Sequence, residues 1–486
     1  MSELRSKTIS GLKWTYVSNF LVRGIQPVVV AILARILAPE DFGLMAMALA
    51  VSGFVSLFRD AGLGQALIQH RGETEGLVDR AFWLMFLLGG VWFGLTWVCA
   101  PIVAEFYHRK EIVSILRVLG TLFLVYPFSD IVLNLLLRQL EFKALLFRQL
   151  FPLLLSGAVS IGLACAGYGV WSLVWGTVVG AVGTSVVVCA LTGWMPRWRP
   201  GSGSLAGPVR FGLHVSLQRI LGWLTASVDQ VLVGKFLGAA SLGVYRMAWT
   251  YGEIPWTMVT GPFNVVAYPI FCKASQDRSE VRRLYLSFLR WLSLIGVPIG
   301  VSAALLAPYL VPLVLGEKWV EAMPIIQLIA IVGINSSIVC VNPEAYKAIG
   351  RADVASKFLL ARALASLPVY YYASHRGIVT LAVSHVLLVC IFGPVNMYVS
   401  MRLLGISLKE LLGSMRGGIL VGLSLALAGA LYYWAARQIG TSLYVATAGM
   451  LLVVLLTSCA AFYAFDRTAF RQAVAALLTR GAAEGP

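Results

Sequence analysis

The stretch ARILAPEDFGLMAMA, residues 34–48, is echoed 200 positions later by GKFLGAASLGVYRMA, residues 234–248. Four aligned pairs are identical and one keeps its positive charge: Leu37/Leu237, Gly43/Gly243, Met47/Met247, Ala48/Ala248 and the basic pair Arg35/Lys235. An internal repeat at a fixed offset indicates a chain built from two similar lobes.

The composition around this repeat is that of a membrane protein. Of the 486 residues, 59% are hydrophobic and 12% are charged, whereas an ordinary soluble domain carries about 25% charge. Long apolar runs joined by short polar connectors differ from the alternating pattern of a membrane β-barrel, so the predicted spans are helices. This composition excludes a soluble single-core protein and a disordered or fibrous chain.

Fourteen stretches are long enough to cross the hydrocarbon core, for which a helix needs roughly 20 apolar residues. They run over residues 14–37, 43–68, 81–104, 112–137, 145–166, 170–193, 209–237, 242–272, 286–315, 321–349, 354–373, 377–404, 411–436 and 441–465. Because six spans separate the two copies of the repeat, the lobes share one orientation and form parallel repeats. The predicted fold is therefore an all-α integral membrane protein with two parallel six-helix lobes and two further C-terminal helices.

The linker WMPRWRPGSGSLAGP, residues 194–208, interrupts the hydrophobic pattern after the sixth span. We assign residues 1–200 to the N-lobe with helices 1–6 and residues 201–404 to the C-lobe with helices 7–12. Residues 405–486 supply helices 13 and 14 and a cytoplasmic tail.

The positive charges predict the orientation in the membrane. Of the 38 Lys and Arg residues, 25 fall at alternate connections on one side and 5 on the other, and the basic side of a membrane protein is cytoplasmic. Both termini are thus expected in the cytoplasm, with the first apolar stretch retained as a span rather than cleaved as a signal peptide. The net charge of +16 is explained by these loops, and no basic run with interleaved aromatics predicts a nucleic-acid partner.

Ionisable side chains at membrane depth are costly, so they normally face a bundle interior or a wet cavity. Beyond the 30 Lys and Arg residues assigned to the connections, eight basic residues remain inside the predicted spans, against five acidic residues that lie beyond the first residue of a span, and this surplus favours an anionic cargo. At about 1.5 Å per residue, Arg23, Arg59 and Arg219 all lie about 13–15 Å from the cytoplasmic ends of their spans. Three guanidiniums at one level suit a phosphate group. Asn19, Arg23 and Gln26 follow one helical stripe that would line the cavity.

Other charged residues leave two interpretations open. Arg35 and Lys235 lie near span ends, where they either contact the cargo or snorkel and pair with neighbours. Asp60, Asp229 and Glu344 either balance local charge or bind a coupling proton or sodium ion. The seven cysteines stand singly without a C-x-x-C pair, so we expect no disulfide framework and no metal site. We also expect no cofactor and no catalytic residue.

Two stretches resemble the polysaccharide transporter, or Wzx-like flippase, branch of the MOP superfamily, whose relatives include lipid II flippases and MATE antiporters. Residues 34–69 carry the Leu37, Pro39, Phe42-Gly43 and Asp60-x-Gly62-Leu63 pattern, and Asn342-Pro343 is followed by AIGRADVASK at residues 348–357. Fourteen spans and the six-plus-six repeat extend this resemblance over nearly the whole chain.

The resemblance implies a multi-pass flippase of the bacterial inner membrane. Such a protein moves an undecaprenyl-diphosphate-linked oligosaccharide from cytoplasm to periplasm by alternating access, for lipopolysaccharide, capsule or exopolysaccharide biosynthesis. The implied partners are this lipid, membrane lipid and the glycan polymerase machinery. Arg23 and Arg59 match in kind the cavity arginines of such a flippase. Arg219 matches less well, because it lies one turn before Trp223, the repeat equivalent of Arg23.

Two other function classes stay open. A MATE-like, cation-coupled drug exporter shares the fold but would want a carboxylate where the first span has Arg23. A membrane-embedded glycan polymerase or ligase would need a sizeable extracytoplasmic loop or an exposed acidic motif, and the predicted loops are only a few residues long.

The charge asymmetry predicts that the loop around Ser279 is cytoplasmic. In a cysteine-free background, Ser279→Cys should therefore resist an impermeant thiol reagent added outside intact cells. The matched control is Arg437→Cys at a predicted extracytoplasmic connection, which should react. Labelling of Ser279→Cys from outside would mean that the orientation is inverted.

Overall fold

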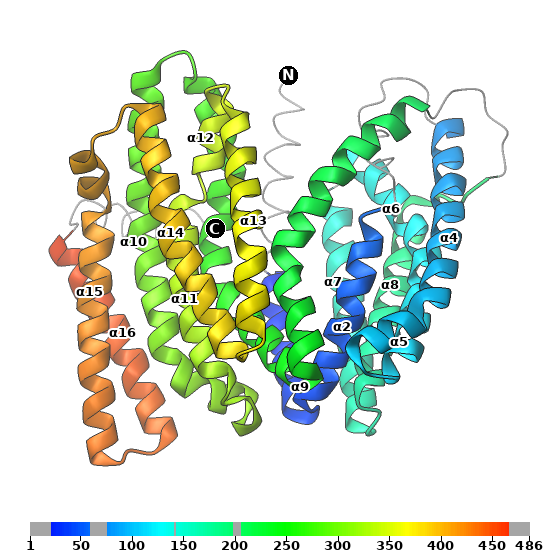
Figure 1. Ribbon diagram of the computed structural model, residues 1–486, viewed down its shortest axis with the longest axis horizontal. Helices are drawn as coiled ribbons and strands as arrows, with labels where there is room; N and C mark the ends of the chain where they lie inside the picture. Colours follow the sequence, from blue (N-terminus) through cyan, green and yellow to red (C-terminus); the bar gives the residue numbers. More distant parts are fainter. Residues whose placement is uncertain (1–20, 59–74, 140–141, 198–205, 466–486) are drawn as a thin grey trace, which may run out of the picture. The chain divides into compact units, whose positions relative to one another are not determined.

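The computed structural model describes residues 21–58, 75–139, 142–197 and 206–465, and within these ranges all regular secondary structure is helical (Figure 1). Ten of the described helical segments are long and apolar enough to cross a membrane. The helices follow the predicted spans, and the all-α prediction is confirmed for this part of the chain.

The elements run in the order of the predicted spans, with one long helix, α9, taking the place of two of them. Their bounds are a helix over residues 21–36, α2 (Pro39–Ser56), α4 (Glu75–Tyr107), α5 (Glu111–Gly120), α6 (Leu122–Gln139), α7 (Phe142–Cys165), α8 (Val170–Thr192), α9 (Ala206–Ala274), α10 (Arg278–Leu310), α11 (Ala322–Val339), α12 (Asn342–Ala348), α13 (Ala352–Ser374), α14 (Ile378–Leu404), α15 (Leu408–Ile439) and α16 (Leu443–Phe465). Short turns η1 (Val311–Leu315) and η2 (Glu317–Trp319) follow α10.

A break in α9 supplies the predicted boundary between the seventh and eighth spans. Gly238 has φ 83° and ψ −179°, a backbone conformation that a residue with a Cβ rarely adopts. Hydrogen bonds join Asp229 to Tyr245 and Gln230 to Arg246, each across 16 positions. The chain therefore reverses direction around Gly238.

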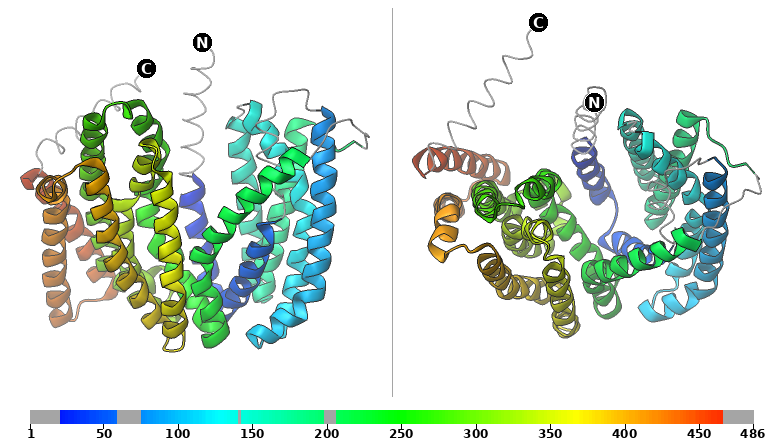
Figure 2. Two further views of the ribbon diagram at one scale, coloured as in Figure 1. Left: turned by 45° about the horizontal axis from the view of Figure 1, so that its top comes forward. Right: turned by 90° about the horizontal axis from the view of Figure 1, so that it is seen from above.

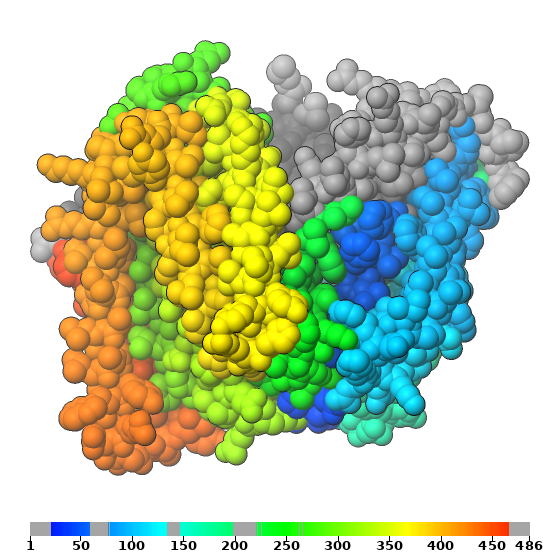
Figure 3. Space-filling view, in the orientation of Figure 1, coloured from blue at the N-terminus to red at the C-terminus, as the bar shows by residue number. Residues whose placement is uncertain are grey.

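The chain forms two compact units, residues 1–246 and 247–486. In unit 1, α7 packs on α8, α4 packs on α5 and α6, and α2 packs on α5 and α8 (Figure 2). On the face of unit 1 seen in Figure 3, α2 (dark blue) is visible between α4 (light blue) and α9 (green). In unit 2, α10 packs on α11 and α15, α15 on α16, and α14 on α11 and α13. These units divide within α9, and the lobe boundaries inferred from the repeat stay a prediction.

The two copies of the repeat meet inside unit 1 with their backbones in contact. A Cβ added to Gly43 would lie 1.7 Å from the carbonyl oxygen of Ala239, and a Cβ added to Gly243 would lie 1.8 Å from that of Pro39. With an offset of 200, Pro39 corresponds to Ala239 and Gly43 to Gly243, so the two contacts are reciprocal. The neighbouring Met47 is fully buried. Glycines at both positions let α2 and α9 cross more closely than side chains allow.

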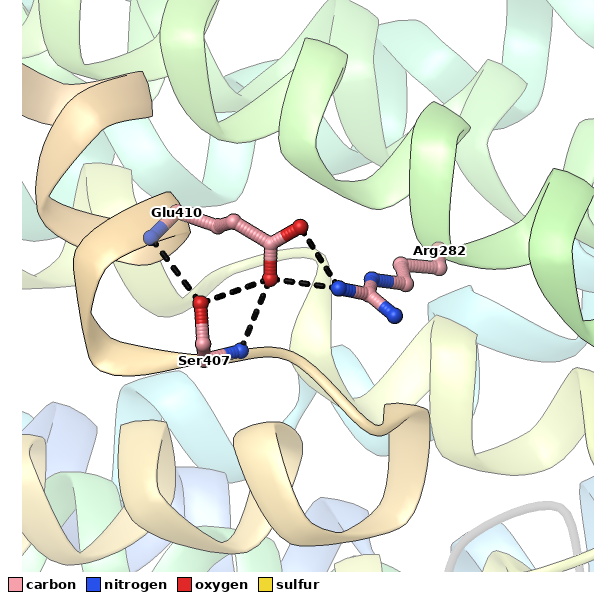
Figure 4. A network of polar contacts seen from close by, with 3 residues as sticks. All are labelled: Arg282, Ser407 and Glu410. Atoms are coloured by element: carbon pink, nitrogen blue, oxygen red, sulfur yellow. Dashed lines mark hydrogen bonds and ion pairs between the residues drawn. The ribbon is translucent and has the colours of Figure 1, made fainter.

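In unit 2, a small polar network joins the start of α15 to α10 (Figure 4). The Arg282 guanidinium on α10 donates to both Glu410 carboxylate oxygens, at 2.5 Å each. The Ser407 backbone amide and hydroxyl donate to one of those oxygens, at 2.9 and 2.8 Å, which forms a capping box for α15. Asp277 caps α10 in turn, and hydrogen bonds from the Ser279 hydroxyl and backbone amide lower the pKa of its carboxyl. The α10 and α15 starts are thus ordered by charge-assisted contacts.

The reciprocal crossing predicts that neither repeat glycine tolerates a side chain. Gly43→Ala or Gly243→Ala should destabilise the folded protein by about 1–3 kcal/mol, as overpacking does, because the added methyl must push two backbones apart. The measurement is thermal unfolding of the purified variants in detergent. The matched control is Gly94→Ala on α4, where an added Cβ meets nothing within 4 Å. Unfolding of Gly43→Ala at the wild-type temperature would contradict the close crossing.

Candidate functional site

The predicted cavity stripe lies on the helix over residues 21–36. Arg23 and Gln26 sit near its start with exposed side chains, and Arg35 is exposed at its far end. Asn19 and Arg59 lie outside the described residues. That the guanidinium groups of Arg23, Arg59 and Arg219 lie at the same depth in the membrane therefore stays a prediction.

Arg219 falls within α9, but its side chain lies outside the described part of the structure. Asp60 also lies outside the described residues.

Lys235 bridges the first half of α9 to the end of α4. Its ammonium donates to the Phe106 carbonyl oxygen at 2.5 Å and lies 3.2 Å from Nε2 of His108. It also stands 4.8 Å from the centre of the Phe106 ring. A cation at the C-terminal end of a helix is favourable because the last carbonyl groups there lack partners within the helix. Of the two interpretations of Lys235, the structure shows pairing with a neighbouring helix, and cargo contact stays a prediction.

The turn after α4 carries a second connection within unit 1. Arg109 forms an ion pair with Glu40 on α2, with 2.7 Å between the charged atoms. His108 has φ 57°, the left-handed region, which ends α4 and turns the chain toward α5. The α4–α5 turn thus touches both copies of the repeat, Glu40 in the first and Lys235 in the second.

Asp229 is a buried carboxylate, with 4% of its surface exposed. The Tyr245 hydroxyl donates to its Oδ2 at 2.7 Å. The adjacent pair has the same spacing, since the Arg246 guanidinium donates to the Gln230 side-chain oxygen at 3.1 Å. Sequence reasoning named Asp229 but missed Tyr245. The equal spacing of the two pairs around Gly238 is the signal that could have found it.

Glu344 lies on the short helix α12, where it forms an ion pair with Lys347 at 2.9 Å. Its neighbour Asn342 is fully buried and accepts a hydrogen bond from the Tyr285 hydroxyl at 2.8 Å. The Tyr346 hydroxyl donates to Oδ1 of Asn396 at 2.7 Å. The Asn342-Pro343 motif therefore anchors α12 to α10 and α14.

Unit 1 also holds an apolar pocket of about 310 Å³ between α2, α4 and the first half of α9. Sequence reasoning did not anticipate it, because its lining residues come from three separate parts of the chain. Among the described residues, no group of three or more His, Cys, Asp or Glu side chains is placed to hold a metal ion.

The chain is similar to proteins of polysaccharide biosynthesis. The family model described as polysaccharide biosynthesis protein matches residues 32–324. The teichuronic acid biosynthesis protein TuaB of Bacillus subtilis (strain 168) is 28% identical over 73% of this chain and 74% of its own length. The lipopolysaccharide biosynthesis protein WzxC of Escherichia coli (strain K12) is 25% identical over 75% of each chain. The succinoglycan biosynthesis transport protein ExoT of Rhizobium meliloti (strain 1021) is 26% identical over 77% of this chain and 76% of its own length.

Two solved structures share the fold. The lipid II flippase MurJ in an inward closed conformation covers 94% of this chain and 99% of its own, with a TM-score of 0.75 and 12% identity. An inward-facing multidrug resistance MATE transporter of the MOP superfamily covers 79% and 94%, with a TM-score of 0.64 and 15% identity. The predicted MATE/MOP-like fold class is thus confirmed.

Proposed function

The chain belongs to the polysaccharide biosynthesis protein family, and from that premise we propose that it is a flippase for a polyprenyl-diphosphate-linked oligosaccharide. The cargo crosses the bacterial inner membrane from cytoplasm to periplasm and serves the assembly of lipopolysaccharide, capsule or exopolysaccharide. The related ExoT is named as a transport protein, which favours a transporter over an enzyme. Multiple apolar helices make the chain a multi-pass membrane protein.

The observation that carries the proposal is the basic surplus inside the spans. Eight basic residues against five acidic ones at membrane depth match a cargo whose head group bears a diphosphate. Arg23 lies on the helix over residues 21–36, where its side chain is exposed. A guanidinium offers a planar fork of donors that fits phosphate oxygens two at a time.

A cationic drug exporter would share the fold, but a basic surplus inside the spans does not suit its cargo. A site for an organic cation requires a carboxylate or aromatic cage, whereas Arg23 and Gln26 place an arginine and an amide on the first helix. The polymerase or ligase alternative lacks a described loop long enough to build an extracytoplasmic active site, since the described connections at that side, such as residues 108–110 and 375–377, are short.

The membrane potential favours outward movement of an anionic head group. With a negative interior, each negative charge moved outward gains about 2.3 kcal/mol per 100 mV. The empty carrier must still return, and a cation bound at a carboxylate would change which conformation is favoured. The burial of Asp229 and its hydrogen bond with Tyr245 on the other half of α9 support it as one candidate for this role. Asp60 and Glu344 are the other two candidates.

Loss of the arginines should weaken transport. Each charge-assisted contact with phosphate contributes about 1.5–3 kcal/mol, so Arg23→Ala or Arg59→Ala should lower transport about tenfold or more at normal protein level. Lysine at either position should restore transport only in part, because an ammonium lacks the planar fork. The measurement is complementation of a transporter-null strain, with glycan at the cell surface as the readout. Full complementation by both alanine variants would exclude these contacts.

Neutralising a coupling carboxylate should slow cycling while leaving lipid binding nearly unchanged. We expect this most strongly for Asp60→Asn, with Asp229→Asn and Glu344→Gln tested beside it. Asp229→Asn removes the charge but keeps the local structure, because an amide oxygen can still accept the Tyr245 hydrogen bond. The measurements are binding of the lipid-linked sugar and flipping in vesicles, with and without a pH or sodium gradient.

The control for this experiment is Tyr245→Phe, which removes the hydrogen bond to Asp229 but leaves its charge. If Asp229 only stabilises the fold, Tyr245→Phe should lower protein stability, and both Tyr245→Phe and Asp229→Asn should leave the gradient response intact. Unchanged flipping and unchanged gradient response in all three neutralised variants would assign the carboxylates to structure and leave the membrane potential as the driver.

A further inference from the structure

The apolar pocket of unit 1 lies between α2, α4 and the first half of α9. It has a volume of about 310 Å³, at the lower end of the range for small-molecule pockets. We call it the slot, and its defining residues are Ala50 and Phe54 on α2, Ile102 and Phe106 on α4, and Trp223 and Val231 on α9.

The slot covers a defined range of depth. At about 1.5 Å per residue, Ile102 lies about 8 Å from the end of α4 at Tyr107, and Phe54 lies about 22 Å from the start of α2 at Pro39. Trp223 lies equally far from the break at Gly238 by the same rise. Since these three helix ends come together at the α4–α5 turn, the slot extends from near that end of unit 1 toward the middle of the membrane.

Several of the side chains that line the slot are large, apolar and exposed. Ile102 is 65% exposed, Phe106 is 42% exposed and Phe54 is 40% exposed. The inner end is closed by aromatic contact, since the Phe54 and Trp223 rings lie 5.0 Å apart. In Figure 3 the α2 surface between α4 and α9 is open to view. Such a concave apolar surface within a membrane is solvated by hydrocarbon chains rather than by water.

The Lys235 cation lies at the outer end of the slot. The Lys235 ammonium is held 4.8 Å from the Phe106 ring, and that ring is part of the slot lining. Its bond to the Phe106 carbonyl fixes this position. An ammonium has three donors, so the group can bind an anion while it keeps contacts with the protein. An apolar slot with a cation at its outer mouth is complementary to an anionic amphiphile.

We propose that the slot binds the isoprenoid chain of the lipid-linked cargo in the extracytoplasmic leaflet, with the first phosphate of that chain at Lys235. This inference rests on the proposed function and on the proposed orientation, which together put the α4–α5 turn on the periplasmic side. A small apolar slot with the Lys235 cation at its end suits a lipid that has an apolar chain and a phosphate head. The experiment below tests whether this lipid or a phospholipid occupies it.

The position of the slot indicates the step of the transport cycle at which it binds the lipid. Its mouth is at the periplasmic end of unit 1, and its inner end reaches past the middle of a hydrocarbon core about 30 Å thick, so the mouth receives the chain after the head group has crossed. The slot is then a product site, from which the lipid passes to the surrounding leaflet. This role is distinct from that of Arg23, which lies toward the cytoplasmic end of its helix.

Photocrosslinking tests the proposal. A benzophenone amino acid replaces Ile102 in the slot, and for comparison Trp175 on α8, which is 44% exposed and lies at a similar depth from its own helix end. The full-length variants are reconstituted in vesicles of phosphatidylethanolamine and phosphatidylglycerol that contain undecaprenyl monophosphate. Mass spectrometry then identifies the lipid joined to each position. We expect undecaprenyl phosphate at position 102 and chiefly phospholipid at position 175.

Substitutions at two other positions, 231 and 235, test whether the adduct depends on the slot and on the Lys235 charge. Val231→Trp fills the slot and should abolish the undecaprenyl adduct at position 102. Lys235→Gln removes the charge and should lower that adduct about fivefold, in line with one basic residue near an anionic head group, whereas Lys235→Arg should keep it. These readouts measure binding and do not depend on transport.

Equal undecaprenyl adducts at both positions, or phospholipid alone at position 102, would overturn the slot assignment. If phospholipid is found there while labelled cargo is still flipped, the slot inference fails and the flippase proposal stands. If undecaprenyl phosphate is captured at position 102 but cargo is not flipped, the slot stands and the proposed function fails.

Discussion

The close approach of two backbones at Gly43 and Gly243 is the contact on which the rest of unit 1 depends. In a membrane no hydrophobic force drives helices together, so close packing of small residues takes over that role. Here each glycine faces the carbonyl of the sixth residue of the other repeat copy, Ala239 for Gly43 and Pro39 for Gly243. The crossing fixes the reversal of α9 at Gly238, which in turn brings Tyr245 to Asp229 and Lys235 to the end of α4. The crossing also brings together α2 and α9, and residues of both helices line the apolar slot.

A second constraint explains where the polar residues of the spans are found. A polar group in hydrocarbon must find its partner within the protein, because no water is present to supply one. Asp229 bonds to Tyr245, Asn342 to Tyr285, and the Lys235 ammonium to a helix-end carbonyl. These pairs hold the helices in register. They also show that polar residues inside a span can serve structure and function together, as Asp229 would do if it binds a coupling ion while it anchors two halves of one helix.

The helical architecture could be predicted from the sequence because the hydrocarbon thickness fixes the length of each apolar run. The predicted spans 209–237 and 242–272 put a boundary after Leu237, and the break is found at Gly238. Contacts between distant parts of the chain were not predictable in the same way. Nothing in the local pattern links Lys235 to Phe106, which lies 129 positions away, and the slot combines residues from three helices. Glu344 illustrates the opposite case, since its partner Lys347 is one turn away on the same helix.

The central claim is that the protein moves an anionic lipid-linked sugar across a membrane, and reconstituted flipping tests it most directly. Purified protein is placed in liposomes that carry a fluorescent polyprenyl-diphosphate oligosaccharide, and a membrane-impermeant quencher reports how much cargo reaches the outer leaflet. Parallel liposomes carry a fluorescent organic cation. The account predicts that the protein accelerates translocation of the anionic lipid and leaves the cation unmoved. Transport of the cation without flipping of the lipid would contradict it.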